Sequence, residues 1–99
     1  MLLAPVIAVG YNFSMRPITY SKDAVKTLRR LPSNVSALIV SKIQQVAIAP
    51  ESLGNNLKQL KGRPGEFRLR VGDWRVVMAD DCVVVAVIKI GPRGSVYEE

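Results

Sequence analysis

Residues 67–75 read FRLRVGDWR, a run in which arginines alternate with apolar side chains. Successive side chains of a strand point to opposite faces of a sheet, so this run predicts one apolar face and one guanidinium face. The Gly-Asp pair within it fits a two-residue hairpin turn, which would place Arg70 directly opposite Arg75, with Arg68 on the same face. Because like charges in opposed positions destabilise a sheet, removing one of them should stabilise the hairpin by ~0.2–1 kcal/mol. The cluster therefore predicts a bound anion.

Further cations accompany the hairpin. Lys61 and Arg63 precede it, and Arg93 follows the last apolar run. Residues 58–75 alone carry six cations and two anions. A solvated strand face that keeps the sheet soluble is the alternative, but such protection usually takes only one or two charges. Arginine suits phosphate because its planar fork donates two hydrogen bonds and stays charged. We expect this face either to bind an RNA backbone or to stabilise a pentacoordinate phosphate during its cleavage.

Cleavage requires a base, and the chain has no histidine. The candidate nearest the arginines is Tyr97, in RGSVYEE. A tyrosine titrates near ~10 when unperturbed, but neighbouring arginines favour the phenolate and would lower its pKa. Such a tyrosine could accept the 2′-hydroxyl proton of RNA. Taken alone, a tyrosine third from the end of a chain is more often a packing residue.

The composition predicts one soluble globular domain with an anionic partner. The 99 residues are 48% hydrophobic and 22% charged, and the net charge of +6 favours nucleic acid, an acidic protein or an anionic surface as that partner. The single cysteine, Cys82, is interpreted as a structural bystander; it cannot form a disulfide within the chain, which favours a reducing cytoplasm. Without histidine, zinc sites built from Cys and His are excluded, and we expect neither a metal nor another cofactor.

The first fourteen residues, MLLAPVIAVGYNFS, carry no charge. They are too few to form a transmembrane helix and lack the positive start of a signal peptide. We interpret residues 1–14 as an upstream extension or the result of a mis-called start codon, with Met15 opening a single domain over residues 15–99; a targeting role is the alternative.

From Arg16 onward the pattern predicts an α+β fold. A strand at 17–20 precedes a helix capped by Ser21, and a second helix, capped by Ser33 or Asn34, runs towards Pro50. After a loop, strands are expected at 67–71, 74–79 and 83–90, the last covered on both faces. The two helices should form an antiparallel hairpin on one face of a mostly antiparallel twisted sheet. The expected core is Leu28, Leu31, Leu38, Ile39, Ile43, Phe67, Leu69, Trp74, Val76, Val85 and Val87.

The segments LKQLKGRPGEFRLRVGDWRVVM and VVVAVIKIGPRGSVYE, with YSKDAVKTLRRLP and IAPESLGNN upstream, resemble the RelE branch of the RelE/ParE toxin superfamily. The resemblance covers about residues 18–97. It implies the RelE-like microbial RNase fold with its active site on the open sheet face. It also implies a toxin that is paired with an antitoxin and cleaves messenger RNA on the ribosome, without a metal.

Individual residues match the family's functional positions. Arg75 matches its phosphate-stabilising arginine, Arg93 the arginine after the last strand, and Tyr97 the tyrosine proposed as general base. Arg68 and Arg70 occupy basic positions where relatives can have lysines. Lys61 corresponds to a further basic residue at the rim. Since arginine cannot be tuned towards proton transfer, the two on the first hairpin strand can act only electrostatically.

The same resemblance leaves two alternatives open. A ParE-like member would inhibit DNA gyrase by binding and cut nothing, and a degenerate toxin would survive only as an antitoxin-binding module. The presence of Arg75, Arg93 and Tyr97 together favours the nuclease. The expected partners are messenger RNA, the ribosome and an acidic antitoxin lying on the basic sheet or along the helical hairpin, with no membrane partner.

Overall fold

The computed structural model describes residues 15–94, so the proposed extension at 1–14 and Tyr97 lie outside the described residues. The elements follow one another as β1 (Ile18–Tyr20), α1 (Lys22–Arg30), α2 (Ser33–Ile48), the 3₁₀ segment η2 (Pro50–Asn56), β2 (Leu57–Gln59), β3 (Glu66–Val71), β4 (Trp74–Asp80) and β5 (Val85–Pro92).

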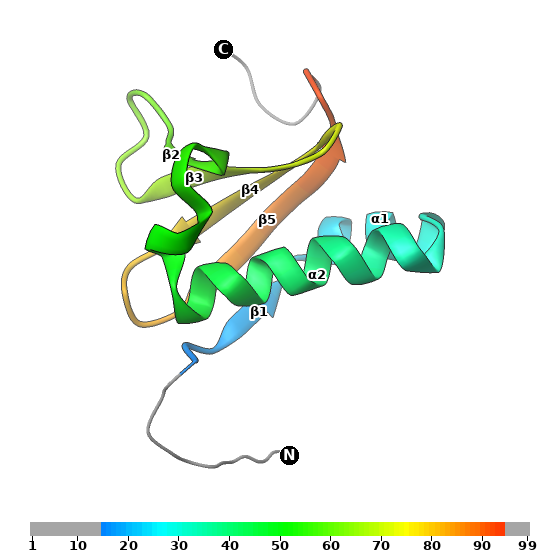
Figure 1. The fold of residues 1–99 in the computed structure, drawn as a ribbon, viewed down its shortest axis with the longest axis horizontal. Coiled ribbons are helices and arrows are strands. Elements are labelled where there is room, and N and C mark those ends of the chain that lie inside the picture. Colours follow the sequence, from blue (N-terminus) through cyan, green and yellow to red (C-terminus); the bar gives the residue numbers. More distant parts are fainter. Residues whose placement is uncertain (1–14, 95–99) are drawn as a thin grey trace.

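The described strands form one sheet in the order β1-β5-β4-β3-β2. Only the β1–β5 pair is parallel; the other three pairs are antiparallel. The two helices carry the chain along one side of the sheet from β1 towards β2 at the opposite edge, and the antiparallel strands β2 to β5 then return to β1, so that β5 pairs with it in parallel (Figure 1). The predicted α+β fold is confirmed.

The ends of both helices follow from local hydrogen bonds. Ser21 Oγ accepts the amide of Ala24 at 3.0 Å and caps α1, as expected. The predicted cap of α2 is wrong, because Pro32 occupies the cap position without a side-chain bond. Its carbonyl accepts the amides of Val35 and Ser36, and its fixed φ suits the start of a helix. Ser33 is therefore already helical.

The core lies between the helices and one face of the sheet. Its fully buried side chains include Ile39 and Ile43 of α2, facing Leu69 of β3. Of the predicted core, Ile39, Ile43, Leu69, Val76, Val85 and Val87 are buried, and Leu28, Leu31, Phe67 and Trp74 pack against them while partly buried. Leu38 is 50% exposed, so its prediction is wrong. One residue is about 100° of helix rotation, which turns Leu38 away when Ile39 faces the sheet.

Two strands differ from the sequence prediction. The loop expected after Pro50 contains η2 and the short strand β2, whose polar residues gave no strand pattern. The last strand begins at Val85 rather than Val83, because the Asp81 carboxylate accepts the amides of Val84 and Val83 at 2.9 and 2.8 Å. These two hydrogen bonds hold the pKa of Asp81 below its ordinary value. The expectation that β5 is covered on both faces is also wrong, since Ile88 is 40% exposed.

Candidate functional site

The β3–β4 hairpin has the predicted register. Residues 72 and 73 form its two-residue turn, and Arg70 pairs with Arg75 across the strands. Gly72 has a φ of 59°, which glycine adopts without strain and which the first position of such a turn requires. Both arginines therefore share the face of the sheet turned away from the helices, here called the open face.

Alternation along the two strands assigns the other residues to this face. Leu69 and Val71 are buried against the helices, which leaves Arg68 and Arg70 on the open face. Val77 lies directly opposite Arg68 and is on the open face too. The predicted separation into an apolar and a guanidinium face is thus observed.

Arg75 is held by its own turn. Its Nη1 donates to the carbonyl oxygens of Gly72 at 2.9 Å and Trp74 at 3.0 Å, and the residue is only 8% exposed. Arg70, by contrast, is exposed and donates from Nε to Asn56 Oδ1 at 3.2 Å, towards the β2 side. The opposed guanidinium groups are therefore bonded in different directions. This arrangement limits their repulsion, so the pair alone does not require an anion.

The end of η2 also anchors Arg68. Arg68 Nη2 donates to the carbonyl oxygen of Asn55 at 3.2 Å. Neighbouring asparagines thus restrain both cations of β3, which fixes the spacing of positive charge on the open face. The sequence pattern predicts only a loop for these asparagines, whereas they end η2.

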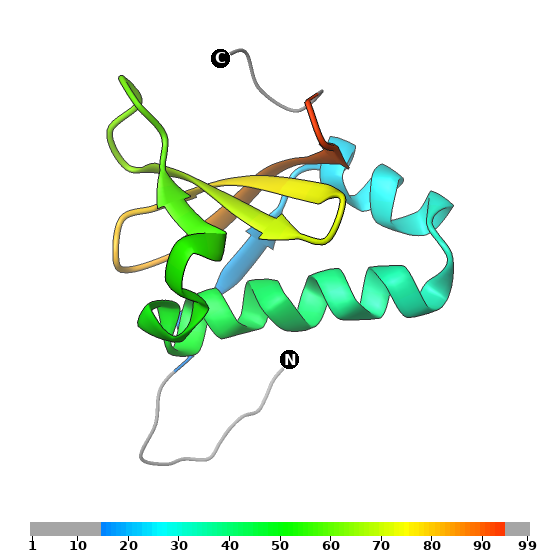
Figure 2. The ribbon, with the colours of Figure 1, turned by 45° about the horizontal axis from the view of Figure 1, so that its top comes forward.

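The predicted site residues separate into two groups at opposite ends of β3. Arg93 follows β5, and its amide donates to the Asp73 carbonyl at 2.8 Å, which places its backbone beside the hairpin turn and near Arg75. Lys61 and Arg63 belong to the β2–β3 loop, at the far end of the hairpin from the turn (Figures 1 and 2). Arg63 pairs there with Glu66 at 2.8 Å. The structure therefore places Arg70, Arg75 and the backbone of Arg93 around the hairpin turn, with Lys61 and Arg63 at the other end of β3 and Arg68 between the two groups.

Two lysines that sequence reasoning did not assign to the site also lie on the open face. Lys58 of β2 pairs in register with Arg68, and Lys89 of β5 lies opposite Val77. For Lys58, the excess of charge between residues 58 and 75 was a usable signal. For Lys89, strict alternation along β5 predicts the opposite face, which the helices cover.

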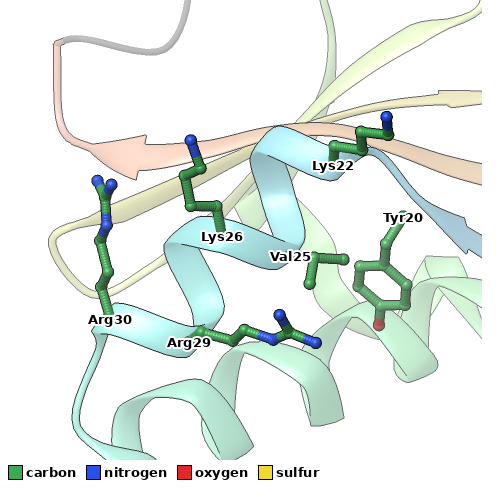
Figure 3. Close-up of a pocket in the computed structure, with 6 residues that line it drawn as sticks. All are labelled: Tyr20, Lys22, Val25, Lys26, Arg29 and Arg30. Carbon is green, nitrogen blue, oxygen red and sulfur yellow. The ribbon is translucent and has the colours of Figure 1, made fainter.

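A second basic surface follows α1. A shallow groove of about 520 Å³ is lined by Tyr20, Lys22, Val25, Lys26, Arg29 and Arg30 (Figure 3). Burial raises the pKa of Tyr20 above its ordinary value, so this tyrosine remains a neutral phenol near pH 7 and is poorly suited to act as a base. The groove can attract an anionic partner but provides no evident chemistry.

Residues 15–94 contain neither a candidate metal site nor a candidate membrane-spanning helix. No three His, Cys, Asp or Glu side chains in this part of the chain are grouped so that they could hold a metal ion. None of the described helices combines the length and the apolar character needed to cross a bilayer.

Comparison with known proteins places the chain in a family. The family model described as "ParE toxin of type II toxin-antitoxin system, parDE" matches residues 18–97, most of the chain. The chain belongs to the RelE/ParE toxin superfamily. The resemblance in the sequence is thereby confirmed. Among curated protein sequences, none matches the chain.

Solved RelE structures share the fold of this superfamily member. The isolated E. coli RelE toxin is 27% identical, with a TM-score of 0.65 over 79% of this chain and 84% of that one. The intact E. coli RelBE toxin–antitoxin complex gives 26% identity and a TM-score of 0.63, covering 85% and 99% of the two chains. The archaeal RelE–RelB complex from Pyrococcus horikoshii OT3 gives 23% identity and a TM-score of 0.68, covering 83% and 99%.

Proposed function

We propose that this superfamily member is an endoribonuclease toxin that cleaves messenger RNA on the ribosome. The observation that carries the proposal is the pairing of Arg70 with Arg75 on the open face, with the backbone of Arg93 beside the same hairpin turn. Arg75 is already oriented there by two carbonyls of its own turn. A donor fixed before the substrate arrives needs no reorganisation when negative charge develops on a phosphate.

The reaction follows from these residues and from Tyr97. Tyr97 comes four residues after Arg93, so at most ~14 Å of extended chain separates their backbones. Nearby guanidinium groups would favour its phenolate, which takes the proton of an RNA 2′-hydroxyl. The 2′-oxygen attacks the adjacent phosphorus, and the arginines stabilise the phosphorane. As the bond from phosphorus to the 5′-oxygen breaks, Arg93 stabilises the negative charge on the leaving oxygen, which takes a proton from water. The products are a 2′,3′-cyclic phosphate and a 5′-hydroxyl end.

The proposal includes an acidic antitoxin as partner and the cytoplasm as the place of action. The E. coli and P. horikoshii complexes named above each pair a RelE toxin with RelB. The chain has a net charge of +6, and two of its surfaces are basic: the open face and the α1 groove. Either surface offers electrostatic attraction to an acidic segment.

A second candidate function is inhibition of DNA gyrase by binding alone. The ParE description of the matching family favours it. Arg75 and Arg93 remain compatible with this role, as docking residues for an acidic surface. The two functions differ in whether Tyr97 is needed for chemistry.

Expression of the chain without a partner tests the proposal. We expect growth arrest accompanied by new messenger 5′ ends, and loss of both with Tyr97→Phe at equal levels of folded protein. A supercoiling assay with purified gyrase serves as the parallel arm. Growth arrest that persists in Tyr97→Phe, with gyrase inhibited and no new 5′ ends, would establish the gyrase function instead. Normal growth at verified expression of folded protein would contradict both.

A further inference from the structure

A β-bulge determines where the only lysine of β5 points. The β4–β5 register pairs Val77 with Lys89 but Met78 with Val87, so Ile88 is an extra residue on β5. Val85 and Val87 are buried against the helices, and strict alternation would send Lys89 to the same side. After the extra residue, the side chains of β5 that face the helices and those that face the open side exchange positions. Ile88 and Lys89 are consequently both exposed, while Ile90 returns to the core at 3% exposure.

The cap of α1 holds this bulge in place. Ser21 Oγ donates to the carbonyl oxygen of Ile88 at 2.6 Å, and the Ser21 amide donates to the Val87 carbonyl at 2.9 Å. The same Oγ accepts the amide of Ala24. One side chain thus fixes both the start of the helix and the irregular strand. The position of Lys89 is therefore built into the fold.

Lys89 belongs to a row of cations across the sheet. In register, Lys58 of β2 lies opposite Arg68 of β3, Arg68 opposite Val77 of β4, and Val77 opposite Lys89. Val77 is only 1% exposed although it lies on the open face, which indicates that long neighbouring side chains cover it. Within residues 15–94, neither Lys58 nor Lys89 has an ion-pair partner.

This second row runs parallel to the first, which contains Arg70 and Arg75. The rows are two residues apart along β3, a separation of about 7 Å. Single-stranded RNA advances from one phosphate to the next by a step of similar size. Parallel rows of cations at that spacing match the backbone of one strand better than they match an isolated anion.

We propose that Lys89, with Lys58 and Arg68, binds the phosphate adjacent to the one that Arg70 and Arg75 bind. The inference rests on the proposed RNA-cleaving function and specifies the substrate of the same site as single-stranded RNA held by two consecutive phosphates. The bulge positions this contact, because it turns Lys89 onto the open face, where the RNA backbone would lie.

Salt-dependent binding tests the role of Lys89 without requiring cleavage. Tyr97→Phe protein would be titrated against a fluorescein-labelled ten-nucleotide single-stranded RNA at several KCl concentrations. Each phosphate contact contributes about 0.7 to the slope of log K against log[salt]. We expect Lys89→Gln to reduce the slope by about 0.7 and Lys89→Arg to restore it. Lys42→Gln, the same change of charge on α2, should leave the slope unchanged.

A second arm locates the contact during cleavage. A methylphosphonate, which removes the charge of one linkage, would be placed next to the scissile phosphate of a messenger on the ribosome. The wild-type protein should cleave this modified messenger more slowly than the unmodified one. The Lys89→Gln protein should cleave both messengers at the same reduced rate.

The possible outcomes separate the inference from the function. An unchanged slope in Lys89→Gln overturns the inference even if the wild type cleaves RNA, as does an equal loss of slope in Lys42→Gln. A reduced slope in a protein that never cleaves supports the phosphate contact and contradicts the nuclease. Absence of salt-dependent RNA binding by the Tyr97→Phe protein overturns the inference outright.

Discussion

Arg75 combines a structural role with its proposed chemical one. Its two hydrogen bonds to Gly72 and Trp74 close the hairpin turn, and the residue is almost entirely buried. Opposed like charges alone predict that its removal stabilises the hairpin. The observed bonds reverse that expectation, because truncation would leave two carbonyl acceptors without this donor.

Substitution of Arg75 should affect both rate and stability, by separable amounts. Arg75→Ala is expected to lower single-turnover cleavage on saturated ribosomes by ~10²–10³-fold, since a preorganised donor to the phosphorane is lost. It should also lower the free energy of unfolding by about 1–2 kcal/mol. Rates measured well below the melting temperature of the variant distinguish the two effects. Arg75→Lys keeps the positive charge. Relative to Arg75→Ala, it should restore the affinity for RNA more than it restores the cleavage rate.

A different result would change the role assigned to Arg75. If Arg75→Ala weakens RNA binding while the rate at saturation stays unchanged, the arginine belongs to a docking surface. If both are unchanged and only the melting temperature falls, its function is confined to the turn.

At the scale of elements, α2 shows how a shift of one residue along a helix separates the core from the surface. Ile39 and Ile43 are completely buried, while Leu38, immediately before the first of them, is half exposed. The helix contains only one charged residue, Lys42, so its sequence gives little indication of which side faces solvent. Packing against β3 sets the phase.

Two leucines provide a matched test of this arrangement. Leu69→Ala in β3 should reduce the free energy of unfolding by roughly 2–5 kcal/mol, because it opens a cavity in a fully buried site. Leu38→Ala makes the same chemical change on the exposed side of α2 and should cost much less. Urea denaturation of both variants measures the difference. Equal losses would show that Leu38 is buried in solution.

At the scale of the whole molecule, the excess positive charge occupies two separate surfaces. The open face contains the candidate chemistry, and the α1 groove offers cations without a suitable base. If one segment of an antitoxin bound along the groove, a second segment of the antitoxin would be needed to block the open face. The distribution of charge therefore favours an extended partner over a compact one.

The proposed use of arginines in place of a metal predicts a specific response to sulfur substitution. A phosphorothioate at the scissile phosphate should slow cleavage, and thiophilic Mn²⁺ or Cd²⁺ should not restore the rate, because guanidinium groups contact the non-bridging oxygens. Single-turnover cleavage of the two separated diastereomers on ribosomes measures this effect. Rescue of one diastereomer by a thiophilic ion would show that a metal takes part and would overturn the mechanism.

The sequence by itself determined the hairpin, its register and its charged face. Alternation in residues 67–75 and a glycine at the turn suffice for these, because the period of a strand and the geometry of a two-residue turn are local properties. Ser21 could be identified as a cap for the same reason. The family resemblance also came from local motifs. It alone gave the role proposed for Arg93, whereas Tyr97 was already the candidate base because the chain has no histidine.

Only the tertiary structure decided which cations share a site. Lys61 and Arg63 are close to Arg68 in sequence, yet the hairpin places them at the end away from the turn, whereas distant Arg93 lies beside it. The face occupied by Lys89 depends on a bulge that Ser21 stabilises from another element. Such placements arise from pairing between segments remote in the chain, and alternation within one strand carries no information about them.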